Sequence, residues 1–312
     1  LISFGNSSFV ISIPKSWIGK SKLKKGDLIY LEEKDADLIL SPHSQDTEKK
    51  EKEITIEVDG KELKHIKREI IGAYIRNYKT IILTGNEIKD KAKEIQSVIQ
   101  RLVALEVMEQ TSKRIVAKDF LNLDDVSTKS ILRKLDVIIR SMFEDCEKSF
   151  EEDNYESINY RDLDVNKLVF LMFRIVRFGQ ENTSYAFKKL DLSPVDLSNL
   201  WWLSYDLESI ADEIKRIARY LRQVSLDKHK QKDFLELLRE IKESYLNIMK
   251  AYYEKDVPLV HKVINQREEI ISHCESFGGK GGQGGKIVGL LAERAKIAIV
   301  HINHIGRVLY QS

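Results

Sequence analysis

The sequence predicts a mainly α-helical protein with a swapped-hairpin β domain at its start, a small α+β layer in the middle and two tandem three-helix bundles at its end. Three observations predict this class. A hairpin pattern with strand alternation opens the chain, strand and helix patterns alternate in the middle, and almost everything after residue 127 has helical periodicity. The expected domains are 1–42, 53–125, 127–223 and 224–312.

The overall composition is typical of a soluble protein with a substantial core. The chain has 312 residues and a formal net charge of +2, so an argument for nucleic-acid binding has to rest on local charge. Cys146 and Cys274 lie far apart and form no CxxC pattern, which favours inert thiols in a reducing compartment. No apolar run approaches the ~18 residues of a membrane helix, so we expect a cytoplasmic protein that is not an integral membrane protein.

The first forty residues predict two short strands joined by a basic turn. Phe9, Ile11 and Ile13 alternate onto one face of a strand that Pro14 closes, and a second apolar run covers residues 28–31. A hairpin unit of this size cannot bury a core of its own, so we expect it to pair with a second copy. Pairing doubles a cationic surface that suits the phosphates of duplex DNA. The lysines of this surface are Lys15, Lys20, Lys22, Lys24 and Lys25, against Asp27 alone in residues 1–31.

This segment resembles the swapped-hairpin DNA-binding domains of the AbrB/SpoVT/MazE group over about residues 4–42. The resemblance rests on a strand that ends in the run Pro14 to Trp17, then on the run Leu23 to Asp27, and on the apolar strand that follows. It implies a homodimer that binds duplex DNA. Members of this group usually begin with another basic strand, which looks truncated here because the chain starts at Leu1. The alternative is a module that only assembles copies of the chain.

A polar linker at 43–52 and a small α+β layer are predicted next. Strand patterns and helical patterns alternate over about 70 residues of this region. The expected strands are 54–58, 80–83, 104–110 and 114–120, and the expected helices are 63–75 and 88–102.

Six long amphipathic helices account for the rest of the chain. Ser193 as N-cap, Pro194 at the first helical position and Asp196 within reach of the cap mark one start clearly. The runs 206–212 and 291–297 each come about 80 residues into a three-helix unit, which predicts a tandem repeat. The glycine-rich run 278–286 lacks the residues of a Walker loop and predicts a flexible linker. The expected helices are 128–150, 155–180, 194–223, 229–254, 256–276 and 287–311.

Two helices of the first bundle carry polar pairs one turn apart. Glu208 and Asp212 are spaced i, i+4, and Asp162 and Asn166 repeat that spacing on the preceding helix. If these faces meet, three carboxylates and one amide converge, a hard-oxygen set that suits Mg, Mn or iron. The alternative is an ordinary solvated acidic face.

The tandem bundles, with the run Leu-Glu-x-Ile-x-Asp at 207–212, resemble the PhoU family of phosphate-uptake regulators. In that family, acidic i, i+4 pairs on two adjacent helices hold a multinuclear metal cluster in each bundle. The resemblance implies a divalent metal or iron site in the first bundle, with Asn166 in place of an acid, and a lost site in the second. There Glu293 matches the motif, but Ile297, Arg267 and Ile271 replace the other three acids, and Glu268 and Glu269 are out of register.

The order of the parts resembles archaeal fusions of an AbrB-type domain with a PhoU-type regulator. It implies a homodimeric, DNA-binding regulator of phosphate uptake, with a phosphate ABC transporter or a regulatory kinase as further partners. The alternative is an interaction protein that binds no DNA and docks such a partner through its bundles. His301 and His304 are spaced i, i+3 and could share a metal, although packing or solvent contact is expected. No catalytic arrangement is present, so we expect no enzyme.

Overall fold

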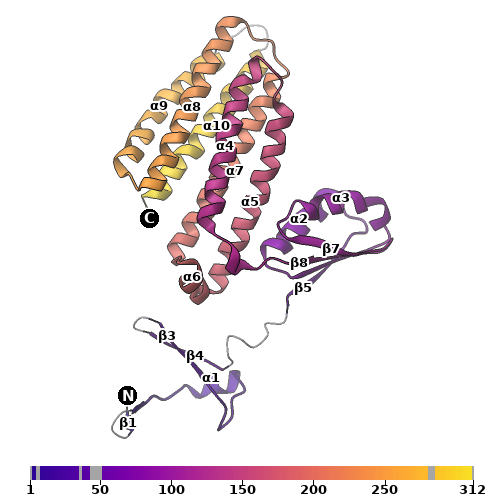
Figure 1. The fold of residues 1–312 in the computed structure, drawn as a ribbon, viewed down its shortest axis with the longest axis vertical. Helices are drawn as coiled ribbons and strands as arrows, with labels where there is room; N and C mark the ends of the chain where they lie inside the picture. Colours follow the sequence, from indigo (N-terminus) through magenta and orange to yellow (C-terminus); the bar gives the residue numbers. More distant parts are fainter. Residues whose placement is uncertain (1, 5–7, 35–36, 43–50, 280–284, 311–312) are drawn as a thin grey trace. The chain divides into compact units, whose positions relative to one another are not determined.

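The structure, a computed structural model, describes residues 2–4, 8–34, 37–42, 51–279 and 285–310. It divides into two compact units, Leu1–Glu51 and Lys52–Ser312, which are called the N-terminal unit and the C-terminal unit below (Figure 1). Most of the predicted linker at 43–52 and of the glycine-rich run at 278–286 lies outside the described residues.

The N-terminal unit contains two short antiparallel hairpins and one short helix. Strand β1 (Ile2–Phe4) pairs with β2 (Ser8–Val10), and β3 (Tyr30–Lys34) pairs with β4 (Asp37–Ser41). Helix α1 (Lys15–Lys20) lies between the two hairpins in the sequence.

Helix α1 corrects the prediction of two strands joined only by a turn. The first strand ends at Val10 rather than Ile13, and the second begins at Tyr30 rather than Leu28. Pro14 has no N–H to donate, but its carbonyl accepts hydrogen bonds from the N–H groups of Trp17, at 2.9 Å, and Ile18, at 3.2 Å. Pro14 therefore starts a helix and does not close the strand, which ends four residues earlier.

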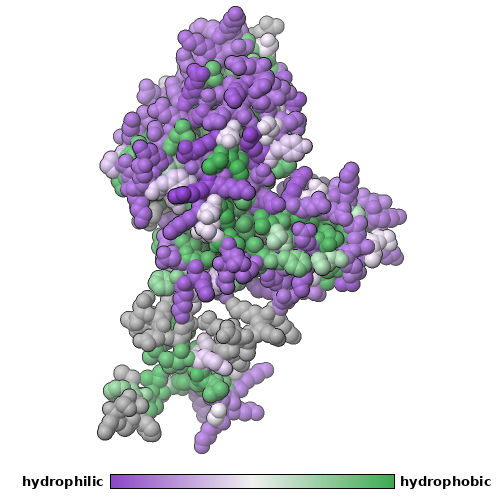
Figure 2. Space-filling view, viewed as in Figure 1, coloured by the Kyte–Doolittle hydropathy of each residue, from purple (hydrophilic) through white to green (hydrophobic). Residues whose placement is uncertain are grey.

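The N-terminal unit has no buried side chain among those that the structure describes. Phe9 is 69 % exposed, Leu28 77 % and Leu31 59 %, and Figure 2 shows apolar side chains on the surface of this unit. The expectation that the unit lacks a core of its own is therefore confirmed for its described residues.

The C-terminal unit begins with the predicted α+β layer. Strand order is β5-β6-β8-β7, with β5 parallel to β6 and the other two neighbours antiparallel. Helices α2 and α3 cover one face of the sheet, and Ile66, Ile81, Ile95 and Ile115 lie in the core between them (Figure 1). The elements are β5 (Glu53–Glu57), α2 (Leu63–Ile75), β6 (Thr80–Thr84), α3 (Ile88–Gln100), β7 (Leu105–Gln110) and β8 (Arg114–Asp119).

Seven α-helices follow in the described residues, where six were predicted. Helices α4, α5 and α7 form a first three-helix group, and α8, α9 and α10 form a second. The additional helix, α6, lies in the stretch that was predicted as a connection between α5 and α7. Asn182 is the C-cap of α5, and Asp191, at φ +54°, is the C-cap of α6. The bounds are α4 (Thr128–Glu147), α5 (Tyr155–Glu181), α6 (Thr183–Leu190), α7 (Pro194–Leu221), α8 (Lys228–Glu254), α9 (Val257–Gly279) and α10 (Gly285–Leu309).

The two three-helix groups share one hydrophobic core. Helix α7 packs against α10, and α4 packs against α8, so these contacts join the two three-helix groups. Leu207 on α7 and Ile299 on α10 are both fully buried in this common core. Within the described residues, no helix combines the length and the apolarity needed to cross a membrane.

A buried ion pair fastens the α+β layer to the first three-helix group. Arg174 on α5 is 1 % exposed and forms two hydrogen bonds with Asp119 at the end of β8, at 2.8 and 2.5 Å. Its Nε donates to Asn77 at 2.8 Å, and its guanidinium lies 4.7 Å from the ring centre of Tyr74. The bidentate geometry fixes one orientation of α5 against the layer.

Candidate functional site

The five lysines of the N-terminal unit lie on α1 and on the turn that follows it. All five are exposed, and none has an ion-pair partner within the described residues. Lys15 and Lys20 are the first and last residues of α1, and Lys22, Lys24 and Lys25 lie in the turn. These five residues are called the lysine cluster below. Because they are exposed and have no ion-pair partner there, their ammonium groups are solvated and available to an external anion.

The turn that carries three lysines of the cluster has two residues in left-handed backbone conformations. These are Lys22, with φ +54°, and Gly26, with φ +96°, where a glycine is favoured. The N–H of Lys24 donates to the Asp27 carboxylate at 2.7 Å, which satisfies the one acid of the segment locally. Asp27 therefore stabilises the turn.

Helices α5 and α7 bring the predicted acidic residues together around a lysine that the sequence analysis did not single out. The Lys215 ammonium lies 2.7 Å from Asp162 on α5 and 2.7 Å from Asp212 on α7. Arg216 contacts the second oxygen of Asp212 at 2.5 Å. The spacing in the sequence already indicates this contact, because Lys215 follows Asp212 by three residues and so lies on the same side of α7.

Asn166 contributes an amide to the same group of side chains. Its Nδ2 donates to the backbone carbonyl of Asp162 at 2.8 Å and to the Asp162 carboxylate at 3.3 Å. The other carboxylate oxygen, Oδ1 of Asp162, is buried without a hydrogen-bond partner within the described residues. The four predicted residues together with Lys215 are called the acidic site below.

Burial dominates the electrostatics of the acidic site. It raises the pKa of Asp162 above its ordinary value, although the hydrogen bond from Lys215 opposes the shift. Burial also raises the pKa of Glu208, and the neighbouring charges of Asp212 and Asp162 add to that effect. The pKa of Lys215 is raised because its bonds to Asp162 and Asp212 outweigh its burial. Asp162 and Glu208 are therefore protonated more easily than exposed carboxyl groups, whereas Lys215 holds its proton more tightly than an exposed lysine.

A metal ion fits this arrangement only if Lys215 moves. The oxygen donors suit a hard cation, and the unpartnered Oδ1 of Asp162 offers a ligand atom. However, the Lys215 ammonium lies between Asp162 and Asp212, where a shared ion would bind. Within the described part of the chain, no group of three His, Cys, Asp or Glu side chains is placed to hold a metal. The side chains as they stand do not fit a metal, and the metal site remains a prediction.

The corresponding face of the second three-helix group carries a different set of contacts. Glu293 is exposed and lies 3.9 Å from Lys296. Its neighbour Arg294 contacts Glu213 of α7 at 3.4 Å, and Ile271 packs against the common core. These positions contribute to packing and to ion pairs rather than to an acidic cluster.

A buried carboxylate held by two histidines was missed in the sequence. Asp206 on α7 is fully buried, and it lies 3.0 Å from Nδ1 of His301 and 2.6 Å from Nδ1 of His304, both on α10. Sequence reasoning found no acidic neighbour for these histidines because the acid comes from the other half of the repeat. The signal was the position of Asp206 between Leu203 and Ile210 on the apolar stripe of α7. A carboxylate at such a position needs a buried partner.

The remaining candidates have structural roles in the described residues. Cys146 and Cys274 are both buried, and burial raises the pKa of each thiol, that of Cys274 to about 12. Both thiols therefore stay protonated and unreactive at neutral pH.

The two neighbouring tryptophans differ in their surroundings. Trp201 stacks on Phe173 with ring centres 4.1 Å apart, whereas Trp202 is exposed.

Comparison with known protein families identifies the N-terminal part of the chain. The family model described as "Antidote-toxin recognition MazE, bacterial antitoxin" matches residues 2–48. Comparisons with curated proteins and with solved structures give no match. The chain therefore begins with a MazE/AbrB-type domain, as the resemblance of the lysine-containing segment implied.

Proposed function

We propose that this protein is a homodimeric transcriptional regulator that binds duplex DNA through the lysine cluster. The single observation that carries the proposal is a MazE/AbrB-type unit that has no buried side chain and five unpaired lysines among its described residues. The exposed apolar side chains of Phe9, Leu28 and Leu31 would be buried in an interface with a second copy of the chain. Two copies double the cationic surface along a two-fold axis, which matches the repeat of DNA phosphates.

The finer proposal is that the helical part is a PhoU-type double bundle, so that the regulator acts on phosphate uptake. Support comes from the two three-helix groups that share one core and from the convergence of Asp162, Glu208 and Asp212 at the acidic site. A phosphate ABC transporter or a regulatory kinase is the proposed partner of this part. Co-purification of either with the full chain, and loss of that co-purification on deletion of residues 127–312, is the expected result.

DNA binding is tested by fluorescence anisotropy with a duplex from the upstream region of the protein's own gene, at several salt concentrations. We expect affinity to fall steeply with salt, because each phosphate contact contributes about 0.9 to the slope of log K against log salt. The variant Lys15→Ala/Lys22→Ala/Lys24→Ala removes six contacts from a dimer, so the slope should fall by about 5. Equal binding by the variant and the unchanged protein would refute the proposal.

The matched control removes three exposed lysines from the C-terminal unit. Lys67 on α2 and Lys89 and Lys93 on α3 are exposed and have no ion-pair partner within the described residues. The variant Lys67→Ala/Lys89→Ala/Lys93→Ala changes the net charge equally, so unchanged DNA affinity is expected. Sedimentation at micromolar concentration supplies the second measurement, in which a mass of one subunit would contradict the dimer.

A further inference from the structure

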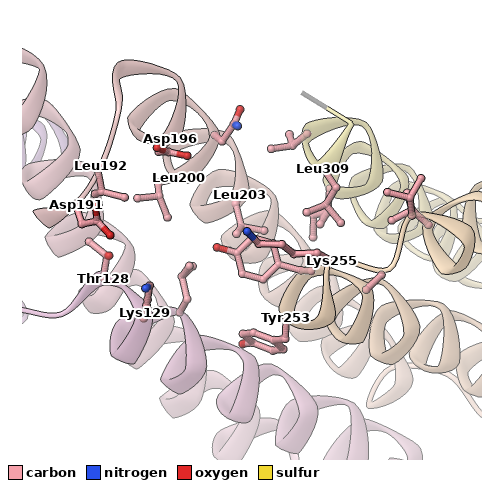
Figure 3. A pocket seen from close by; sticks show the side chains of 18 residues that line it. Thr128, Lys129, Asp191, Leu192, Asp196, Leu200, Leu203, Tyr253, Lys255 and Leu309 are labelled. Atoms are coloured by element: carbon pink, nitrogen blue, oxygen red, sulfur yellow. The ribbon is translucent and has the colours of Figure 1, made fainter. Parts of the chain in front are cut away.

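A pocket lies where the two three-helix groups meet, at the end of the bundle that holds the start of α4 and the end of α10. Its volume is about 640 Å³, within the ~300–1,000 Å³ range of small-molecule sites in proteins. Figure 3 shows side chains from both groups around this space, which is called the seam pocket below. Because α4 and α7 line it together with α8, α9 and α10, a molecule bound there touches both halves of the repeat.

The walls of the seam pocket are mainly aliphatic. The pocket is lined by aliphatic residues of both groups, Leu132, Leu200 and Leu203 from the first and Val260 and Ile305 from the second. These side chains give the pocket an apolar body that an extended hydrocarbon can fill. A ligand for this site therefore needs a substantial apolar part.

The polar side chains of the seam pocket include several hydrogen-bond donors. The Nδ2 group of Asn199 is buried and has no partner within the described residues. Burial raises the pKa of Tyr252, so its hydroxyl keeps its proton. Lys129 and Lys255 also line the pocket, and neither forms an ion pair in the described part of the chain. Because the Nδ2 atom of Asn199 has no accessible surface, the two ammonium groups are the donors that a ligand can reach.

One of the two acidic residues at the seam pocket is engaged by the protein itself. Asp196 belongs to the capping box of α7, where its carboxylate accepts the N–H of Ser193 at 2.8 Å. Asp191 is exposed to solvent at the end of α6, as Lys129 and Lys255 are at their positions. The first N–H groups of α4 and α9 are capped by Ser127 and by the carboxylate of Asp256. Lys129 and Lys255 are therefore the cationic groups of the pocket that are open to an anionic head group.

We propose that the seam pocket binds an amphipathic carboxylate, with its aliphatic body against the leucine and valine walls and its carboxylate near Lys129 and Lys255. The head group would accept hydrogen bonds from donors that the protein itself leaves unpaired. The ligand would also bridge the two three-helix groups, so binding stabilises their junction. This inference is independent of DNA binding and of the acidic site.

The test uses decanoate with the full-length protein, by isothermal titration calorimetry and saturation-transfer NMR. Saturable 1:1 binding per chain is expected for decanoate, with decanol at least about tenfold weaker because it lacks the charge. Decyltrimethylammonium should bind weakest of the three. Absence of saturable decanoate binding, or binding of the ammonium compound as tight as that of decanoate, would overturn the proposal.

Two variants locate the binding in the seam pocket. Lys129→Met/Lys255→Met should weaken decanoate about tenfold and change decanol less than about twofold. Val257 is 48 % exposed at the rim, so Val257→Trp should fold normally, narrow the pocket and weaken both compounds. The control Lys228→Met/Lys250→Met removes two exposed lysines of α8 that do not line the pocket, and it should bind as the unchanged protein does. Equal weakening by the control and by the Lys129/Lys255 variant would contradict the assigned site.

Discussion

The two units use the same kind of side chain in opposite ways. In the N-terminal unit, the five lysines are exposed and have no ion-pair partner within the described residues, and no described side chain is buried. In the C-terminal unit, Lys215 and Arg174 lie against carboxylates in the interior. Arg174 and Lys215 therefore neutralise carboxylates inside the fold, whereas the five lysines of the N-terminal unit face solvent.

Removal of the buried arginine should produce the largest change in stability. Arg174→Met leaves the carboxylate of Asp119 in the interior with only Lys79 as a counter-ion, at 2.7 Å. Breaking a buried pair by removing one partner costs about 3–5 kcal/mol, and urea unfolding followed by circular dichroism measures the loss. The exposed Arg177, which contacts Glu181 at 3.3 Å, supplies the control Arg177→Met, expected to cost less than about 1 kcal/mol.

A compensating variant makes that comparison sharper. Arg174→Met/Asp119→Leu removes both buried charges, so it should recover part of the stability that the single variant loses. If the double variant is less stable than Arg174→Met alone, the ion pair would not be the cause of the loss.

Removal of Lys215 should have the next largest effect, and the effect should depend on pH. A carboxylate whose pKa is raised in the folded state favours folding at low pH, and that contribution is lost as pH rises through the raised pKa. Lys215→Met raises the pKa of Asp162 further, so the loss should be small at pH 4 and about 2–3 kcal/mol at pH 7. Equal losses at the two pH values would contradict this account.

The same variant tests the metal hypothesis at the acidic site. Without the ammonium between Asp162 and Asp212, a divalent cation can reach both carboxylates. Titration of the unchanged protein and of Lys215→Met with Mn²⁺, followed by calorimetry, distinguishes a site that Lys215 blocks from one that never binds metal. Lys215→Arg keeps the positive charge and serves as the control.

A smaller, pH-dependent effect is expected where α8 and α9 meet. His273 lies 2.9 Å from Glu240 and 3.2 Å from Asp233, and its bonds to these acids raise its pKa although burial opposes the shift. Its contribution to stability is full below the ordinary histidine pKa of 6.5 and is lost as pH rises through the raised value. His273→Gln should therefore destabilise the protein at pH 6 and leave it unchanged at pH 9, as measured by urea unfolding.

The smallest effect on stability should come from the lysine cluster. Lys15→Ala/Lys22→Ala/Lys24→Ala removes exposed side chains without ion pairs in the described structure, so its free energy of unfolding should change by less than about 0.5 kcal/mol. A melting curve recorded beside the DNA titration would check this. A large loss of stability would mean that these lysines support the fold, which would remove the contrast between the two units.

Periodicity alone predicted most of the C-terminal unit. Helix α2 has the bounds that its apolar spacing predicted, and α7 begins at the predicted Pro194 because the capping box at Ser193 is a local signal. Helices α1 and α6 were missed because both are short, and a helix of six or eight residues has little periodicity to detect.

The candidate sites depend on contacts between helices, which a single sequence does not contain. The spacing of Glu208 and Asp212 predicted a shared face, but the choice of Lys215 as counter-ion follows from how α5 and α7 pack. Likewise, the histidines of α10 had no visible acidic partner until the fold placed them against Asp206, about 95 residues earlier in the chain.

That contact between Asp206 and the two histidines has a consequence for dissecting the bundle. Within the described residues, the hydrogen bonds of this interior carboxylate on α7 come from α10 alone. A fragment that ends after α7 would leave the Asp206 carboxylate without these partners and would expose the apolar face that α10 covers. We therefore expect neither three-helix group to fold stably when it is produced without the other.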